Sequence, residues 1–379
     1  MTADVCFALT GDFRCNSRAR RQVNALVASG LSVAVLHRPD PQTPDNDRQP
    51  PPGITLEAFT AATGAGGPRG FLQIHRDLTN HLAGRSFAVA HASDLYVLPA
   101  LTRFAQERRT PVTLDARELY HHVAGTVGKP WARLFWHLLQ KRYLPRVHAA
   151  FTVSDGIADR LAATYGIRRP IVVPNVALNR ARESGADIRS DLGLPRDAFL
   201  AVHTGNIRRH RGCELAVEAA ARFRGLHLAF VGSGQLQLEL ARMADAAGIG
   251  ERVRFIRPVD PEDVTTFIRT ADVGLALLED VCLNHYLALP NKLFEYVAAG
   301  VPVIASALPE IARVVKDHDV GLCVEPSNLD ALTDALRALE SAPERRAAFR
   351  RNCAEASVPL SWEAHRQDFV APFLDLVKK

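Results

Sequence analysis

Short apolar runs alternate with amphipathic stretches through the first half of the chain. The apolar run at residues 4–9 ends in a polar loop, and residues 18–29 follow with apolar positions spaced for one face of a helix. Gly30 ends that helix, and residues 31–37 form the next apolar run. A strand, a helix and a strand in this order predict a parallel sheet covered by helices. Further strands are predicted at residues 54–59, 87–92, 111–116 and 148–154, and the Pro-, Gly- and Asp-rich residues 39–53 and 61–70 are predicted to be loops.

The same alternation starts again at about residue 199 and predicts a second sheet. Two such sheets predict an α/β protein with two doubly wound, Rossmann-like domains facing a central cleft, with ligands beyond the carboxyl ends of the strands. We place an N-terminal domain at residues 1–178, a second domain at 179–355, and a C-terminal helix that crosses back to the first domain at 356–379. Strands of the second domain are predicted at residues 199–204, 226–234, 252–258, 271–278 and 301–306, with helices at 213–223, 236–248, 291–299 and after 259–264.

Composition places the chain among globular proteins. Its 379 residues exceed one ordinary core, and 47% hydrophobic with 23% charged residues is typical of that class. No apolar run approaches the roughly 18 residues that span a bilayer, and the N-terminus lacks the basic segment and cleavage site of a secretory signal. The six cysteines lie far apart without a C-x-x-C pair, so we expect reduced thiols and no metal site. These features predict a cytoplasmic protein.

Positive charge is concentrated in the first half. Residues 1–180 contain 22 Lys and Arg against 13 Asp and Glu, a net +9, and the remainder 24 against 28, a net −4. A basic half suits nucleic acid, an anionic membrane surface or an anionic small molecule, and arginine scattered over the surface explains it equally well. Residues 129–148 mix aromatic and basic side chains, which suits peripheral contact with a membrane and a lipid-linked acceptor. An ordinary helix packed on the sheet is the alternative there, and it is slightly favoured.

Two of the loops that follow predicted strands are rich in glycine. Gly11 opens the loop at residues 11–17, where a phosphate could approach the backbone and Arg14 or Arg18 could add charge; a plain turn explains it as well. The segment "VGSGQL" at residues 231–236 lacks the third glycine of a dinucleotide fingerprint, because Gln237 stands in its place. This departure disfavours a nicotinamide enzyme, while the glycines still permit close approach of a nucleotide or a tight turn.

The loop "GNIRRHRG" at residues 205–212 crowds arginines before a predicted helix. Arg208, Arg209 and Arg211 would repel one another unless they are solvated or face an anion. The planar guanidinium group donates two hydrogen bonds at once, which suits a diphosphate. We favour an anion site over a solvated surface loop.

The segment "LPNKLFEYVAAGVPVIAS" at residues 289–306 is the strongest candidate. Asn291 is expected to cap a short helix whose first amides, together with Lys292, attract an anion. Glu295 lies one turn along among apolar neighbours, and a carboxylate can accept hydrogen bonds from the two hydroxyls of a ribose. The alternative is a glutamate that only favours the positive end of the helix.

These segments together resemble the retaining glycosyltransferases of family 4, which have the GT-B fold. The resemblance extends over nearly the whole chain, and the segment around Glu295 is its most specific part. The other similar segments are "RRQVNALVASGLSVAVL" (20–36), "TLDARELY" (113–120), "FTVSDGIADRLAATYG" (151–166), "HTGNIRRHRG" (203–212) and "FVGSGQL" (230–236), in the order of the family.

The resemblance implies a role for each matching position. Glu295 would bind the donor ribose, Arg211 would neutralise the diphosphate, and Gly11 would line the reaction centre. Three positions depart from the family: Leu287 stands where a glutamate contacts the transferred sugar, Asn206 replaces a loop arginine whose place Arg208 takes, and Arg117 replaces a histidine. The catalytic candidates are therefore Arg211, Arg208, Glu295 and Arg117, and the donor-binding candidates are Gly11, Gly205, Asn206, Gly232, Pro290, Asn291, Lys292, Leu293 and Glu295.

The resemblance implies a retaining, metal-independent glycosyltransferase that moves a sugar from a nucleotide-diphosphate sugar, with a UDP-sugar favoured, to an acceptor hydroxyl. It implies no cofactor besides the donor substrate and no nucleic acid partner. A sugar-nucleotide epimerase remains an alternative because it shares this architecture. A non-catalytic sugar- or nucleotide-binding protein is another, because Leu287 and Arg117 replace the polar residues expected from the family.

Overall fold

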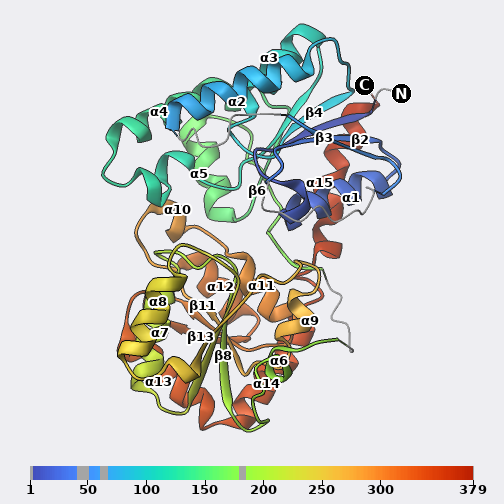
Figure 1. The fold of residues 1–379 in the computed structure, drawn as a ribbon. Helices are drawn as coiled ribbons and strands as arrows, with labels where there is room; N and C mark the ends of the chain where they lie inside the picture. Colours follow the sequence, from blue (N-terminus) through green and yellow to red (C-terminus); the bar gives the residue numbers. More distant parts are fainter. Residues whose placement is uncertain (1–2, 41–50, 60–66, 179–184, 379) are drawn as a thin grey trace. The chain divides into compact units, whose positions relative to one another are not determined.

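The computed structural model describes residues 3–40, 51–59, 67–178 and 185–378. The chain divides into two compact units (Figure 1). The first unit comprises Met1–Pro174 with His365–Lys379, and the second comprises Asn175–Ala364. Each is described below by itself.

The first unit is built on a parallel sheet. In the described residues this sheet has seven strands in the order β3-β2-β1-β4-β5-β6-β7. The strands near its centre are buried on both faces, which explains why their sequences are continuous apolar runs. The strands are β1 (Val5–Ala8), β2 (Val33–His37), β3 (Ile54–Ala58), β4 (Val89–Ala92), β5 (Val112–Asp115), β6 (Ala149–Thr152) and β7 (Ile171–Val172).

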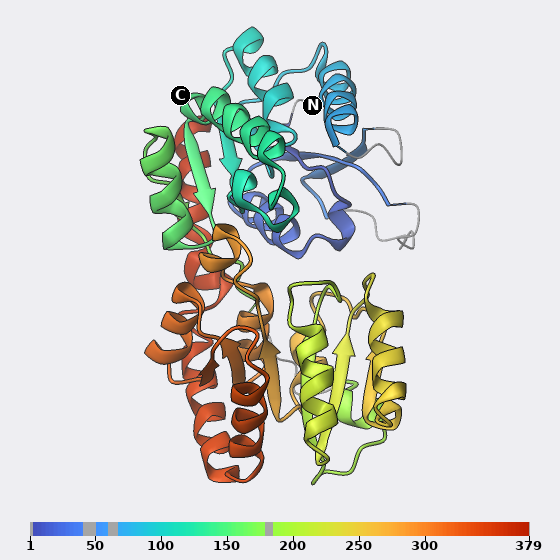
Figure 2. The same cartoon turned by 90° about the vertical axis from the view of Figure 1, so that its left-hand side faces the viewer.

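Helices cover both faces of this sheet. Figure 2 shows α2, α3 and α4 close to one another in the first unit. The C-terminal helix α15 packs with Phe369 and Phe373 against Phe151 of β6 and His91 of β4. The helices are α1 (Ser17–Ala28), α2 (Gly67–Leu82), α3 (Leu98–Arg108), α4 (Pro130–Tyr143), α5 (Asp155–Tyr165) and α15 (Trp362–Val377), with 3-10 turns η1 (Phe13–Cys15), η2 (Tyr120–His122), η3 (Ala124–Thr126) and η4 (Leu144–Arg146).

The second unit repeats the arrangement. Its described residues form a six-stranded parallel sheet in the order β10-β9-β8-β11-β12-β13. Helices α7, α8 and α13 lie on one side of this sheet and α9, α11 and α14 on the other (Figure 1). The strands are β8 (Phe199–Thr204), β9 (Leu226–Val231), β10 (Val253–Ile256), β11 (Val273–Ala276), β12 (Val303–Ser306) and β13 (Gly321–Val324). The helices are α6 (Ile188–Asp191), α7 (Cys213–Arg222), α8 (Gln237–Ala246), α9 (Val264–Ile268), α10 (Leu283–Tyr286), α11 (Asn291–Ala298), α12 (Pro309–Asp317), α13 (Leu329–Glu340) and α14 (Pro343–Ala356), with the 3-10 turn η5 (Gly250–Arg252).

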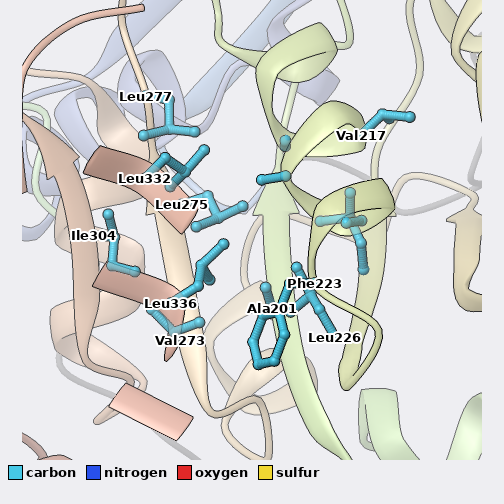
Figure 3. Close-up of a cluster of buried hydrophobic side chains, with 14 of the residues drawn as sticks. Ala201, Val217, Phe223, Leu226, Val273, Leu275, Leu277, Ile304, Leu332 and Leu336 are labelled. Atoms are coloured by element: carbon cyan, nitrogen blue, oxygen red, sulfur yellow. The ribbon is translucent and has the colours of Figure 1, made fainter. Parts of the chain in front are cut away.

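One apolar cluster joins the sheet of the second unit to the helices on its α7 side. Leu275 and Ile304 of the sheet lie close to Leu332 and Leu336 of α13 (Figure 3). These side chains are almost completely buried. Since burial of apolar surface contributes roughly 25 cal/mol per Å², this cluster fixes the sheet on which the candidate site is built.

The predicted fold class, with two parallel α/β sheets, is confirmed. All six cysteines are free thiols, as predicted. The prediction of a loop at residues 61–70 is wrong at 67–70, which begin α2, and the sequence analysis did not identify this helix. Its first residues, Gly67 and Pro68, read as loop signals, but proline is tolerated in the first turn of a helix. Residues 41–50, 60–66 and 179–184, where the rest of the predicted loops and the predicted domain boundary fall, lie outside the described residues. No helix in the described part of the chain is long and apolar enough to cross a bilayer.

Candidate functional site

Three neighbouring segments of the second unit bring the candidate donor-binding residues together. They are the loop between β8 and α7, the turn between β9 and α8, and the start of α11. Strands β8 and β9 are hydrogen-bonded neighbours, so their carboxyl ends meet at one edge of the sheet. The helix α11 is tied to the same edge, because the Tyr296 hydroxyl accepts a hydrogen bond from Thr204 N at 3.0 Å.

The glycines of the first two segments are required by close contact between them. Gly205 has φ +89°, a left-handed conformation that favours glycine. A Cβ atom on Gly232 would lie 2.0 Å from the carbonyl oxygen of Gly205, and one on Gly234 would lie 2.0 Å from that of Ile207. The backbones are also joined by a hydrogen bond from Ile207 N to Ser233 O at 3.0 Å. The glycine turn therefore supports the arginine loop, which accounts for Gly232 without a nucleotide.

The three arginines of the loop do not share one environment. The exposed Arg209 pairs with Glu239 of α8 at 3.1 Å and with Glu214 of α7 at 3.6 Å. The expectation that all three guanidinium groups face an anion is therefore corrected for Arg209. The exposed Arg208 and the half-buried Arg211 both act on His285 of α10, whose pKa is lowered by burial and further by their charge.

The start of α11 differs from the prediction in its cap. Pro290, and not Asn291, is the N-cap, and it has no side chain that could bond the first amides. Asn291 is the first helical residue, and its side-chain oxygen accepts a hydrogen bond from Asn175. The expectation that Asn291 caps the helix is therefore wrong. Leu293 N donates to the carbonyl of Pro290 at 3.1 Å, and the rest of the first turn keeps the partial positive charge of a helix start for another acceptor.

Lys292 adds a titratable cation at the start of α11. Its Nζ atom lies 2.7 Å from Nε2 of His203, which is fully buried on β8. Burial is the main cause that lowers the pKa of Lys292 to about 7; Arg211 acts in the same direction, and Cys213 and Glu295 oppose the shift. Burial, together with the charge of Lys292, holds the pKa of His203 well below its ordinary value of 6.5.

Glu295 is half-buried on α11 and has a defined partner. Its Oε2 atom accepts a hydrogen bond from Thr204 Oγ1 at 2.9 Å. The flanking Phe294 and Tyr296 are buried, which explains the apolar sequence around the carboxylate. The helix thus turns its apolar residues into the core and keeps Glu295 at the carboxyl end of β8. The ribose-binding role assigned to Glu295 remains a prediction.

The first unit places Gly11 in open space. Among the described residues, its chain neighbours aside, no atom lies within 4 Å of a Cβ built on Gly11. The two arginines proposed to add charge to this loop are both paired with carboxylates, Arg14 within the loop itself. Arg14 forms an ion pair with Asp12 at 2.7 Å, and the buried Arg18 forms one with Asp115 at 2.6 Å. Their proposed contribution to a phosphate site in this loop is therefore corrected.

Arg117 follows β5 and is half-buried. Burial acts to lower its pKa, but the charges of Asp115, Tyr120 and Asp94 outweigh burial, so the pKa of Arg117 is raised. The side chain therefore stays a cation at any working pH, and it can supply charge and hydrogen bonds but cannot act as a proton donor.

Two polar residues of β8 were missed by the sequence analysis. His203 and Thr204 end a strand that is otherwise apolar, and the structure joins them to Lys292 and Glu295 of α11. The signal available in the sequence was the pair of polar residues in a buried strand next to Gly205, because a buried polar side chain needs a partner.

Comparison with known sequences identifies the relatives of both units. The family "Glycosyl transferases group 1" matches residues 185–356, and "Glycosyl transferase 4-like domain" matches residues 15–176. D-inositol 3-phosphate glycosyltransferase 1 of Catenulispora acidiphila is 31% identical over 222 residues, which cover 54% of this chain and 52% of that protein. The chain thus spans about half the length of the curated relatives it matches.

Solved structures share the fold over nearly the whole chain. Sucrose-phosphate synthase from Thermosynechococcus elongatus has a TM-score of 0.82 at 20% identity, with 99% of each chain covered. The Anabaena protein HepE in complex with UDP has a TM-score of 0.71 at 15% identity, covering 99% of this chain and 100% of that one. At these identities the likeness shows the fold alone.

Proposed function

Because the chain belongs to the group 1 glycosyltransferases and has the GT-B fold, we propose that it transfers a sugar from a nucleotide-diphosphate sugar to an acceptor hydroxyl with retention of configuration. We propose a UDP-sugar as the donor, and HepE, which has the same fold, is a protein that holds UDP. The observation that carries the proposal is the grouping of Glu295 and Lys292 at the carboxyl end of β8, with Arg211 acting on Lys292.

Catalysis would rest on stabilisation of the leaving group. As the bond between the sugar and the diphosphate breaks, negative charge grows on the diphosphate, and cations already in place around it lower the barrier. Arg211, Arg208 and Lys292 would supply this charge, together with the amides at the start of α11. No resident metal is required in this scheme.

The remaining donor contacts are proposed as follows. Glu295 would accept hydrogen bonds from the ribose hydroxyls, and Leu287, at the C-cap of α10, would face the transferred sugar. An apolar side chain cannot accept hydrogen bonds from sugar hydroxyls, so other groups must hold the sugar. In the first unit, Gly11 and Arg117 would serve the transfer step. The backbone around Gly205, Asn206, Gly232, Pro290 and Leu293 would line the nucleotide.

A thermal-shift screen tests this function. The protein is heated with UDP, GDP, ADP and dTDP at one equal concentration, and a nucleotide present at about 100 times its dissociation constant adds ~2.7 kcal/mol of stability. We expect stabilisation by UDP, and then release of UDP from a UDP-sugar that depends on an acceptor. Conversion of the sugar nucleotide without an acceptor would identify an epimerase instead, and binding without turnover would identify a non-catalytic protein.

We also propose that the first unit contacts an anionic membrane through α4. Trp131, Leu134 and Leu138 lie on one face of this helix and are 62%, 57% and 54% exposed. The opposite face packs into the unit, because Leu139 and Gln140 are buried. One face of α4 therefore packs into the unit, which is one of the two interpretations of the sequence. The other face carries an apolar strip available to lipid. Its exposed basic residues, Lys129, Arg133, Lys141 and Arg142, match an anionic surface.

A peripheral position at the inner face of a membrane follows from this proposal, and the acceptor would then be lipid-linked. The apolar strip would enter the interface between headgroups and acyl chains, while the basic side chains stay with the headgroups.

A further inference from the structure

His203 lies where the segments of the candidate donor site join. It is fully buried on β8, one residue before Thr204. Its Nε2 atom lies 2.7 Å from Nζ of Lys292 at the start of α11 and 3.5 Å from Sγ of Cys213 at the start of α7. Its ring also forms a hydrogen bond with the backbone of Asn206 in the arginine loop. One imidazole therefore contacts the strand end, the loop and both helix starts.

The electrostatics of this contact make the imidazole an acceptor. Burial, the charge of Lys292 and that of Arg211 keep the His203 ring neutral near pH 7, because its pKa is far below the ordinary value. A neutral imidazole has one nitrogen lone pair that can accept a hydrogen bond from an ammonium group. His203 thus holds the Lys292 amine at the first turn of α11 without adding a second positive charge.

Lys292 is surrounded by groups that act on it in both directions. Burial and Arg211 of the loop favour the neutral amine, whereas Cys213 of α7 and Glu295 on its own helix favour the ammonium form. These opposing effects leave Lys292 close to an even balance between its two forms at neutral pH, since its pKa is about 7. A nearby anion would decide that balance.

We propose that His203 is a positioning residue that holds Lys292 beside the bound diphosphate, and that donor binding transfers a proton from solvent to the Lys292 amine. The inference rests on the proposed function, because it assumes that a nucleoside diphosphate binds at this site. The lone pair of the neutral amine takes up the proton on binding, and the ammonium group releases it when the nucleotide leaves.

A purely structural role for His203 makes a different forecast. The ring lies 5.4 Å from that of Phe230 and contributes to packing of the sheet. If packing were its only role, replacing it would lower thermal stability and leave the pH dependence of nucleotide binding unchanged.

The experiment is a calorimetric titration of the full-length protein with UDP between pH 7 and 9, in buffers of different ionisation enthalpy. Above pH 7 the terminal phosphate has largely lost its last proton, so its own ionisation interferes little. At pH 8 we expect the wild type to take up most of one proton per UDP, because a pKa of about 7 leaves Lys292 mainly neutral in the absence of the nucleotide. The dissociation constant for UDP should rise about tenfold per pH unit above the pKa of Lys292.

Variants at Lys292 and His203 locate the effect. Lys292→Arg is charged throughout, so it should bind UDP without proton uptake and with affinity independent of pH. His203→Phe removes the hydrogen-bond acceptor of the Lys292 amine. This change should weaken binding of UDP, and the affinity should begin to decline at a lower pH than in the wild type. His203→Gln restores an acceptor of similar reach. It should return the affinity for UDP, and the pH at which that affinity begins to decline, toward those of the wild type. The control is His227→Gln, because His227 lies on the neighbouring β9 opposite Leu200, at the far end of β8 from the site.

Three results separate the possible failures. Binding of UDP by the wild type without proton uptake would overturn this inference and leave the proposed function standing. The inference would likewise be overturned, with the proposed function intact, if His203→Phe matches the wild type in affinity and pH profile. Absence of binding of any nucleoside diphosphate would instead overturn the proposed function, and this inference with it.

Discussion

Thr204 and Glu295 join the end of β8 to α11 through a hydrogen bond of 2.9 Å from the Thr204 hydroxyl to the Glu295 carboxylate. The two residues are far apart in the sequence, and the contact sets the carboxylate at the edge of the sheet where the arginine loop begins. A second bond runs beside it, from Thr204 N to the Tyr296 hydroxyl. The position of Glu295 is therefore fixed before any ligand arrives, and a carboxylate held in advance binds at a smaller entropic cost.

Glu295→Gln should weaken nucleotide binding more than it weakens the fold. The amide oxygen can still accept the bond from Thr204, but the charge that strengthens bonds from the ribose hydroxyls is lost. A hydrogen bond to a charged partner is worth ~1.5–3 kcal/mol, so the dissociation constant for UDP should rise roughly tenfold to a hundredfold. Calorimetry and a melting curve of the same variant measure the two effects. A lower melting temperature with unchanged affinity would show that Glu295 serves the helix and not the ligand.

Arg211→Ala should weaken binding of UDP far more than binding of uridine, because only UDP carries the diphosphate. The expected loss is ~1.5–3 kcal/mol for UDP. Arg209→Ala is the matched control from the same loop, since Arg209 is paired with Glu239 and Glu214 and should leave both affinities unchanged. An equal loss for UDP and uridine in Arg211→Ala would mean that the loop recognises another part of the donor.

The stability of the first unit should fall in mild acid because of His91. This side chain is fully buried against Phe7, Phe369 and Phe373, and burial lowers its pKa to about 3. The unfolded chain, with an ordinary pKa near 6.5, binds the proton first. Stability is therefore complete above pH 6.5 and falls below it, by about 1.4 kcal/mol per pH unit down to the folded value.

Thermal unfolding of His91→Asn at pH 7.5 and pH 5 measures this contribution. The variant lacks the titrating ring but keeps an acceptor near Thr113, whose hydroxyl lies 2.8 Å from Nδ1 of His91. We expect the variant to be less stable than the wild type at pH 7.5. Between pH 7.5 and pH 5 it should lose about 2 kcal/mol less stability than the wild type loses. A slope in His91→Asn as steep as that of the wild type would refute the assignment.

Binding to acidic liposomes should depend on the apolar strip of α4. The wild type should float with vesicles of anionic lipid at low salt and be released as salt rises, because charges on the surface are screened. Trp131→Ser combined with Leu134→Ser should abolish flotation. Leu238→Ser is the control, since Leu238 is equally exposed, at 63%, but lies on α8 of the second unit. Flotation with neutral vesicles only, or none at all, would favour a soluble acceptor.

The sequence alone determined the strands of both sheets except the edge strands β7 and β13, which were not predicted. Buried parallel strands must be apolar on both faces, so their runs stand out between loops. The sequence also singled out Glu295 and the arginine loop, since charged residues beside apolar or glycine-rich segments are unusual. It missed α2, whose opening residues Gly67 and Pro68 are typical of loops. Local sequence patterns predict an element reliably where buried positions repeat with a fixed period. They are less reliable where a helix begins with glycine and proline, which usually end helices.

Only the tertiary structure decided how the charged groups are distributed. Arg18 and Arg209 read like Arg211 in the sequence, but carboxylates from distant segments pair with them: Asp115 with Arg18 and Glu239 with Arg209. The structure likewise brought His203 to Lys292, a contact that no local pattern encodes. An ion pair or a pKa depends on distances through space between residues remote in the chain, so it follows from the packing of the folded unit and not from the order of its residues.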